Sequence, residues 1–103
     1  MKFIYEDHRI YVTNEEGKTI VNATFPWIKK GVVVVDHTYV DPSLRGQGVA
    51  SNLMHEVCNY AKIKGYKMVA TCPYAVVWFK KHQEFNDLID LETQSTLAPE
   101  CQI

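Results

Sequence analysis

The stretch that decides the fold is Arg45-Gly46-Gln47-Gly48-Val49-Ala50, which joins a β-forming run ending at Val40 to an amphipathic helical pattern. The start of a helix leaves backbone N–H groups without partners and carries a partial positive charge, so it attracts anions. Because the two glycines lack a Cβ atom, a phosphate group can approach these N–H groups, and the arginine adds charged donors at the rim. The stretch predicts either a phosphate site or a tight strand-to-helix turn, and the glycines alone favour neither.

Two familiar nucleotide-binding motifs do not fit this stretch. A Walker loop ends in Gly-Lys-Ser/Thr, and no such ending is present. A dinucleotide fingerprint needs glycine at the position of Ser51 and an acidic residue after the next strand, which here is residues 66–72. The sequence therefore argues against a nucleoside triphosphatase and against NAD binding.

Composition predicts the class of protein. The 103 residues, 47% of them hydrophobic, fit one compact domain, and the net charge of −1 argues against nucleic acid or an acidic membrane surface as partner. Cys58, Cys72 and Cys101 have irregular spacing, which fits neither a disulfide framework nor a metal site. Since no apolar run approaches membrane-spanning length, we expect a cytoplasmic protein with free thiols, no metal and no membrane partner. The oligomeric state cannot be read from these features.

The part of the chain before the glycine stretch is rich in β-forming residues. Strands are expected at residues 3–5, 9–13, 19 to about 28, and 32–40, separated by turn-forming residues. The first three should form an antiparallel meander. The fourth is almost continuously β-branched and aromatic, so we expect a central strand buried on both faces.

After the glycine stretch, apolar residues recur at helical spacing from Val49 to Lys64, and Gly65 is a natural helix end. Residues 66–72 should form a fifth strand, parallel to the fourth because a helical crossover joins them. Pro73 should open a last helix ending near His82. The expected fold is α+β, a mixed α/β arrangement with a mostly antiparallel sheet of about five strands in one domain (residues 1–91) and a loose tail (92–103).

At this point the sequence resembles the GNAT acetyltransferase superfamily, whose coenzyme loop reads Arg/Gln-x-x-Gly-x-Gly/Ala between the fourth strand and a long helix; Arg45, Gly48 and Ala50 match it. The resemblance covers residues 2 to about 89. It is closest to a small single-domain GNAT-like subfamily with an Asp-His-Thr strand, here residues 36–38, and a cysteine followed shortly by an aromatic residue, here 72–74.

The resemblance implies an N-acetyltransferase that uses acetyl-CoA as cosubstrate and an amine as acceptor. The pyrophosphate would bind the backbone amides of residues 46–50, and the pantetheine would run beside the strand that ends at Val40. The implied coenzyme-binding residues are Thr38, Tyr39, Val40, Arg45, Gly46, Gln47, Gly48, Val49 and Ala50. The acceptor amine cannot be identified, because the sequence shows no distinctive charge cluster for it.

Two catalytic mechanisms compete. Larger members of the superfamily use a tyrosine to protonate the departing thiolate, and Phe79 occupies that position here, without a proton to give. In a direct mechanism, His37 or Asp36 accepts the amine proton through a water and Tyr74 protonates the thiolate. In a covalent mechanism, Cys72 takes the acetyl group and passes it on.

Simpler interpretations stand beside these roles. Cys72 could be a small buried apolar residue, and His37 a hydrogen-bonded core histidine. Asp36 and His37 are neighbours on a strand, so their side chains point to opposite faces and at most one enters a site. Two other functions are open: a module that binds or senses acetyl-CoA or CoA without turnover, and a degenerate domain that binds another protein.

Overall fold

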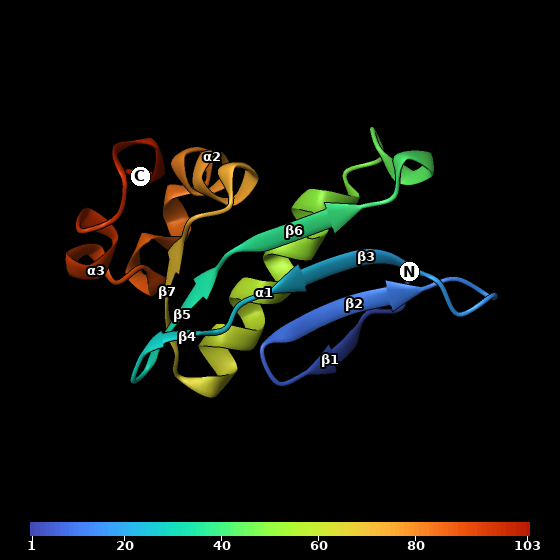
Figure 1. The fold of residues 1–103 in the computed structure, drawn as a ribbon, viewed down its shortest axis with the longest axis horizontal. Coiled ribbons are helices and arrows are strands. Elements are labelled where there is room, and N and C mark those ends of the chain that lie inside the picture. Colours follow the sequence, from blue (N-terminus) through green and yellow to red (C-terminus); the bar gives the residue numbers. More distant parts are fainter.

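Seven strands form two sheets in this mixed α+β fold (Figure 1). The computed structural model describes residues 1–103. The four-stranded sheet is antiparallel, in the order β1-β2-β3-β6, and the three-stranded sheet has the order β4-β5-β7. The strands are β1 (Ile4–Glu6), β2 (Arg9–Thr13), β3 (Thr19–Thr24), β4 (Trp27–Lys29), β5 (Val32–Val35), β6 (His37–Val40) and β7 (Lys67–Ala70).

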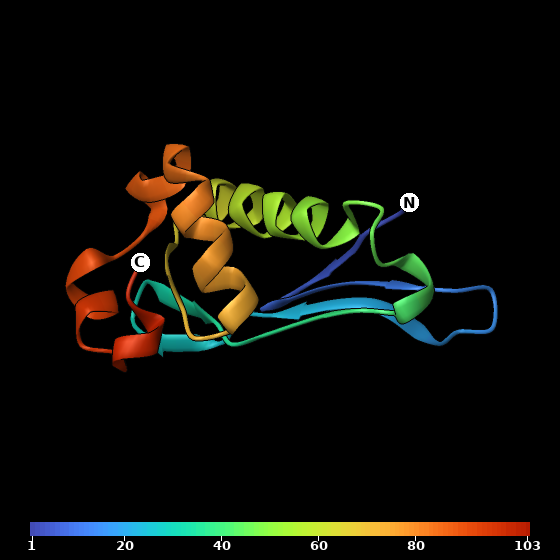
Figure 2. The same cartoon turned by 90° about the horizontal axis from the view of Figure 1, so that it is seen from above.

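The parallel pair β5–β7 confirms the predicted crossover, with Val33 opposite Met68. The crossover helix α1 (Val49–Lys64) lies along one face of the strands, with α2 (Pro73–Lys81) beside it (Figure 2). α1 ends as predicted at Gly65, whose φ of +75° is the left-handed conformation that glycine adopts without strain. The remaining helices are α3 (Leu91–Ser95) and the 3₁₀ segments η1 (Pro42–Leu44), η2 (Gln83–Leu88) and η3 (Pro99–Cys101).

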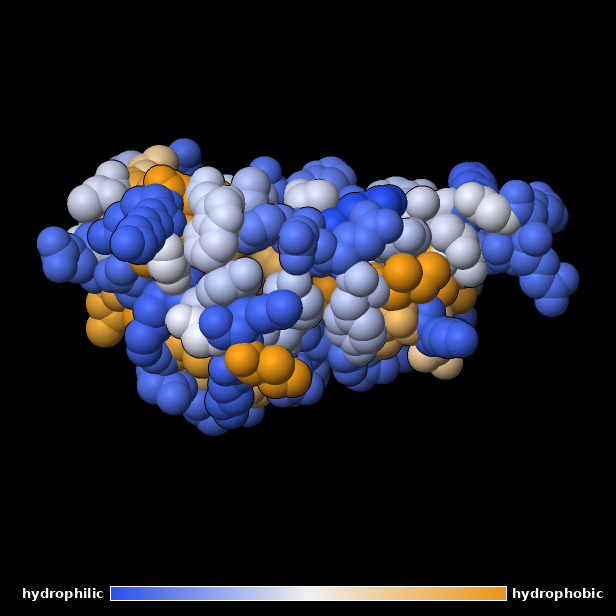
Figure 3. Space-filling model, turned by 90° about the horizontal axis from the view of Figure 1, so that it is seen from below, coloured by the Kyte–Doolittle hydropathy of each residue, from blue (hydrophilic) through white to orange (hydrophobic).

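The main apolar core lies between α1, α2 and the strands, and a smaller cluster consists of Val32, Val34 and Val69. Figure 3 shows one face of the molecule, where separate hydrophobic patches lie among mostly hydrophilic residues. The main core includes the alternating residues of β2 and β3 and the apolar stripe of α1, and its largest fully buried side chains include Phe25, Phe79, Ile10 and Leu53. Burying such side chains removes apolar surface from water, the main stabilising contribution to folding. None of the helices is long and apolar enough to cross a membrane.

The structure divides two segments that were predicted as single strands. Residues 19–28 break at Pro26, which has no N–H for a ladder, and so give β3 and β4. Residues 32–40 break at Asp36, whose carboxylate accepts a hydrogen bond of 2.6 Å from the Thr24 hydroxyl. The prediction of a central strand is therefore right for β5 and wrong for β6, which is an edge strand of the other sheet.

The C-terminal segment differs from the predicted loose tail, because α3 packs against the edge of β7 and η3 packs against α2. Gln94 is almost fully buried, and its side-chain amide pairs with both the N–H and the carbonyl of Ala70, at 2.8 and 3.0 Å. The Gln94 amide also donates to the carbonyl of Cys101, at 2.6 Å. A buried polar group with all these partners holds a segment in place.

Candidate functional site

The glycine loop adopts a conformation that exposes its backbone donors. Gly46 and Gly48 have φ angles of +83° and +74°, and a Cβ atom at either would meet nothing within 4 Å. Glycine is therefore required here by the backbone angles and not by crowding. The N–H groups of residues 46–48 donate to no acceptor in the chain, and the first hydrogen bond of α1 runs from Asn52 N–H to the Gly48 carbonyl at 3.1 Å. The start of α1 thus presents a group of free donors.

Side chains of the loop fasten it to the end of β6. Arg45 donates through Nε to the Val40 carbonyl at 3.3 Å, and Asp41 accepts from both the N–H and the hydroxyl of Ser43, at 3.0 and 2.7 Å. The two hydrogen bonds from Ser43 lower the pKa of Asp41. The loop is therefore held at the strand end without using the N–H groups at the start of α1.

A cavity of about 330 Å³ lies between β6, the loop and the start of α2. Six of the predicted site residues line it: Thr38, Tyr39, Val40, Arg45, Ala50 and Tyr74. This size falls within the range of small-molecule sites. The structure therefore brings predicted strand, loop and helix residues together around one space, and Arg45 and Ala50 among them flank the free donors of the loop in the chain.

Cys72 lies next to this cavity, behind Thr38. Its sulfur is 3.2 Å from the Thr38 hydroxyl, and the residue is 7% exposed at the start of α2. The N–H groups of Thr71 and Cys72 both donate to the Val35 carbonyl, each at 3.1 Å, at the point where β5 and β6 part. Cys72 is thus fixed where the two sheets separate.

Tyr74 faces the cavity from the first turn of α2 and is 41% exposed. Partial burial, and secondly the neighbouring Cys72, raise the pKa of Tyr74 above its ordinary value. Its phenol therefore keeps its proton through the neutral range and can donate it. Phe79, which the family resemblance aligned with the usual acid, is fully buried.

The structure does not bring Asp36 or His37 to this cavity. Asp36 is exposed and hydrogen-bonded to Thr24, while His37 is exposed and pairs with Thr24 in the register of β3 and β6. Because Thr38 faces Cys72, its neighbour His37 points to the other face of β6. The sequence did not identify Thr38 as the partner of Cys72, since nothing local in the chain links residues so far apart.

Trp78 and Ser51 join the two helices behind the site, and sequence reasoning assigned neither a role there. The Trp78 indole donates to the Ser51 hydroxyl at 3.0 Å and so ties α2 to the first turn of α1. No group of three or more His, Cys, Asp and Glu side chains is placed to hold a metal ion.

Comparison with known proteins identifies the family. The model of the GCN5-related N-acetyl-transferase family matches residues 9–88, so the chain belongs to this family. No curated protein matches.

Solved structures share the fold. A GCN5-like putative N-acetyltransferase from Staphylococcus aureus superimposes with a TM-score of 0.72 at 24% identity, over 85% of this chain and 86% of that one. An N-acetyltransferase from Staphylococcus aureus Mu50 is 32% identical, with a TM-score of 0.52, over 76% of this chain and 50% of that one. A GNAT family N-acetyltransferase from Escherichia coli, solved in complex with CoA, is 26% identical with a TM-score of 0.52, over 60% of this chain and 38% of that one. The chain thus spans half or less of the latter two.

Proposed function

We propose that the protein transfers an acetyl group from acetyl-CoA to an amine, and that the transfer passes through Cys72. The observation that carries this proposal is the cavity lined by residues of β6, the loop and α2. Two of its lining residues, Arg45 and Ala50, flank the free backbone donors in the chain, and the hydroxyl of a third, Thr38, lies 3.2 Å from the Cys72 sulfur. The loop offers the donors that a diphosphate needs, and the residue behind Thr38 offers a thiol. Family membership supports acetyl-CoA as the donor.

In this proposal the coenzyme diphosphate binds the N–H groups of residues 46–50, and the pantetheine lies along Thr38 to Val40. Arg45 adds positive charge at the rim, because its side chain stays exposed while Nε is bonded to Val40. A helix start and an arginine together favour a doubly charged group over a neutral one.

The covalent step exchanges one thioester for another. The Cys72 sulfur attacks the thioester carbonyl, the bond from that carbonyl to the coenzyme sulfur breaks, and the thiol proton of Cys72 is transferred, in net terms, to the coenzyme thiolate. Tyr74 lines the cavity, and its raised pKa keeps the phenol protonated. In this route it donates to that thiolate and recovers the proton that Cys72 releases. The neutral amine then attacks the acetyl-cysteine, and the bond from the carbonyl to the Cys72 sulfur breaks. The proton that the amine nitrogen loses is transferred, in net terms, to that sulfur, which gives an amide and a free Cys72 thiol.

Thr38 supports this route as a positioning residue. Its hydroxyl lies 3.2 Å from the sulfur and can accept from the thiol or donate to a thiolate. The direct route would need Asp36 or His37 as base, and both lie away from the cavity in this structure. A second candidate function, binding of acetyl-CoA without turnover, is favoured by Phe79, which leaves the usual acid position without a proton.

Intact-mass spectrometry after mixing with acetyl-CoA tests this proposal. We expect one added acetyl group, released by hydroxylamine as a thioester should be, in the wild type and in Cys101→Ser, and none in Cys72→Ser. Cys101 is a matched control because it is 8% exposed, against 7% for Cys72. Amine acetylation at the wild-type rate by Cys72→Ser would overturn the covalent route, and coenzyme binding without acetylation or turnover would favour the binding module.

A further inference from the structure

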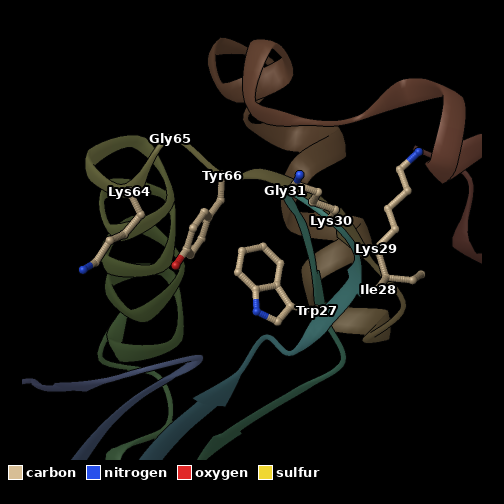
Figure 4. A pocket seen from close by; sticks show the side chains of 8 residues that line it. All are labelled: Trp27, Ile28, Lys29, Lys30, Gly31, Lys64, Gly65 and Tyr66. Carbon is tan, nitrogen blue, oxygen red and sulfur yellow. The ribbon is translucent and has the colours of Figure 1, made fainter.

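A second and larger cavity lies at the opposite end of α1. Its volume is about 730 Å³, and it is lined by the β4–β5 turn, the end of α1 and the residues that lead into β7 (Figure 4). The 16 residues of α1 separate it from the glycine loop. At 1.5 Å per residue this distance is about 24 Å, so the cavity is distinct from the proposed coenzyme site.

An exposed tryptophan lies in the middle of the residues that line this cavity (Figure 4). Trp27 is 48% exposed, although tryptophan is highly buried on average in folded proteins. Two rings pack edge-on against it: Tyr66 at 4.6 Å with an interplanar angle of 64°, and His8 at 4.7 Å with 65°. The His8 ring is fixed in turn by a 2.9 Å hydrogen bond between Nδ1 and the Phe25 carbonyl. These contacts hold the indole in place and leave part of its surface open to a ligand.

Figure 4 shows the rings of Trp27 and Tyr66 in the middle of the cavity, between α1 on one side and the β4–β5 turn on the other. Lysines stand on both sides of these rings, with Lys64 on α1 and Lys29 and Lys30 on the turn. The cavity therefore combines an aromatic centre with lysines from segments far apart in the sequence. In this structure the Lys64 and Lys29 side chains extend away from the rings (Figure 4).

The residues that line the cavity carry positive charge and no negative charge. None of its lining residues is acidic, although the whole chain has a net charge of −1. Lys30 takes part in no ion pair, and Lys64 lies 5.6 Å from the Tyr60 ring with no carboxylate partner. Only Lys29 is paired, at 3.5 Å from Asp90. Two free ammonium groups on flexible stems can therefore turn toward an anion.

We propose that this cavity binds a small planar aromatic molecule that carries a phosphate or a carboxylate. The ring stacks on Trp27, and the anionic group lies between Lys30 and Lys64. A cation would be repelled by the lysines, and a neutral aliphatic molecule would use neither the aromatic surface nor the charge. The proposal does not depend on the acetyl-CoA site, which lies at the other end of α1.

Isothermal titration calorimetry with 1-naphthyl phosphate tests both parts of the ligand. We expect 1-naphthyl phosphate to bind at least about tenfold more tightly than either 1-naphthol or inorganic phosphate, because only the first combines ring and charge; a tenfold ratio corresponds to about 1.4 kcal/mol. Equal affinity for 1-naphthol and 1-naphthyl phosphate would overturn the role of the lysines. No heat with millimolar 1-naphthyl phosphate would overturn the site.

Matched variants locate the binding. Trp27→Ala and Lys30→Glu should each weaken 1-naphthyl phosphate at least about tenfold. Two controls lie outside the cavity lining. Tyr5→Ala removes an aromatic side chain of similar exposure, 50%, and Lys18→Glu reverses the charge of an exposed lysine elsewhere. Both should leave the affinity for 1-naphthyl phosphate unchanged. If Trp27→Ala does not fold, Lys30→Glu alone tests the site, because this substitution changes only an exposed charge. Unchanged affinity in Lys30→Glu would contradict the proposal.

Amide chemical shifts separate this site from the coenzyme site. In ¹H–¹⁵N spectra, 1-naphthyl phosphate should shift residues 27–31 and 64–66, and Gly48→Glu should still bind it. If the shifts instead occur at residues 46–50, and Gly48→Glu no longer binds 1-naphthyl phosphate, the compound binds the glycine loop and the proposal is wrong. Failure of acetyl-CoA binding would leave the 1-naphthyl phosphate result unaffected.

Discussion

The two ends of α1 are built alike and yet offer a ligand different chemistry. Each end has a glycine in the left-handed conformation, Gly48 with φ of +74° and Gly65 with φ of +75°. At Gly65 the local backbone is satisfied, since Gly65 donates to the Lys62 carbonyl at 3.3 Å and Tyr66 to the Ala61 carbonyl at 2.8 Å. At Gly48 the donors are free. One end is therefore suited to recognition by main-chain groups, and the other depends on its aromatic and lysine side chains.

The largest expected effect comes from a charge at the free donors. Gly48→Glu places a carboxylate where the coenzyme diphosphate is proposed to bind, and should weaken acetyl-CoA at least about a hundredfold by calorimetry. Gly17→Glu is the control, because Gly17 is also exposed and has φ of +81°, but lies in the β2–β3 turn. Retained affinity in a folded Gly48→Glu protein would place the diphosphate elsewhere.

Removing the phenol of Tyr74 should have the next largest effect. If Tyr74 supplies the proton to the coenzyme thiolate, Tyr74→Phe should lower the rate of Cys72 acetylation by about tenfold to a hundredfold. The acid form is the active one, so activity should persist below the raised pKa and fall only at pH above the ordinary tyrosine value of about 10. That alkaline fall should disappear in Tyr74→Phe and remain in Tyr11→Phe, which alters an exposed pair with Glu6.

At the other end of α1, a substitution should change stability alone. Gly65→Ala forces a side chain into the left-handed region, at a cost of about 1 kcal/mol in the free energy of unfolding. Denaturant titration measures this loss, and acetyl-CoA affinity should stay at the wild-type value. A drop in coenzyme affinity would show that the two ends of α1 are coupled, which would break the comparison.

The smallest expected effect is on the affinity of the second cavity, through Lys29 and its ion pair with Asp90. Asp90→Asn removes the carboxylate beside Lys29 while keeping an acceptor for the Thr93 N–H, so the second cavity should bind 1-naphthyl phosphate about twofold to threefold more tightly. The Thr93 N–H, and secondly Lys29, lower the pKa of Asp90. Its contribution to stability is therefore present above the pKa of an unfolded aspartate and is lost as the pH falls through the lowered value. Unchanged or weaker binding would show that Lys29 plays no part.

Local signals in the sequence predicted α1 and the glycine loop. The helix ends where the apolar spacing and Gly65 indicate, and β2 matches its predicted residues. The division at Asp36 could not be read, because β-branched and aromatic residues continue on both sides of it and the choice of sheet depends on Thr24, twelve positions away. The burial of Gln94 depends likewise on its pairing with Ala70, and the tail was wrongly predicted for that reason.

The candidate site, like the fold, was predicted only where local signals in the sequence were sufficient. The loop residues and the end of β6 were predicted from the glycine pattern and the family resemblance, and the structure places several of them on one cavity. The contact between Thr38 and Cys72 joins residues 34 positions apart, so it required the three-dimensional arrangement. The second cavity was not predicted, because Lys30 and Lys64 meet around Trp27 only after the crossover has folded.

Trp27 also gives the protein an optical reporter. The chain has two tryptophans, of which Trp27 is 48% exposed in the second cavity and Trp78 is 3% exposed behind the glycine loop. Iodide quenches the emission of solvent-accessible indoles, so it should reduce the long-wavelength component from Trp27 and spare the signal from Trp78. Intrinsic fluorescence can therefore follow each end of the molecule separately, without any attached dye.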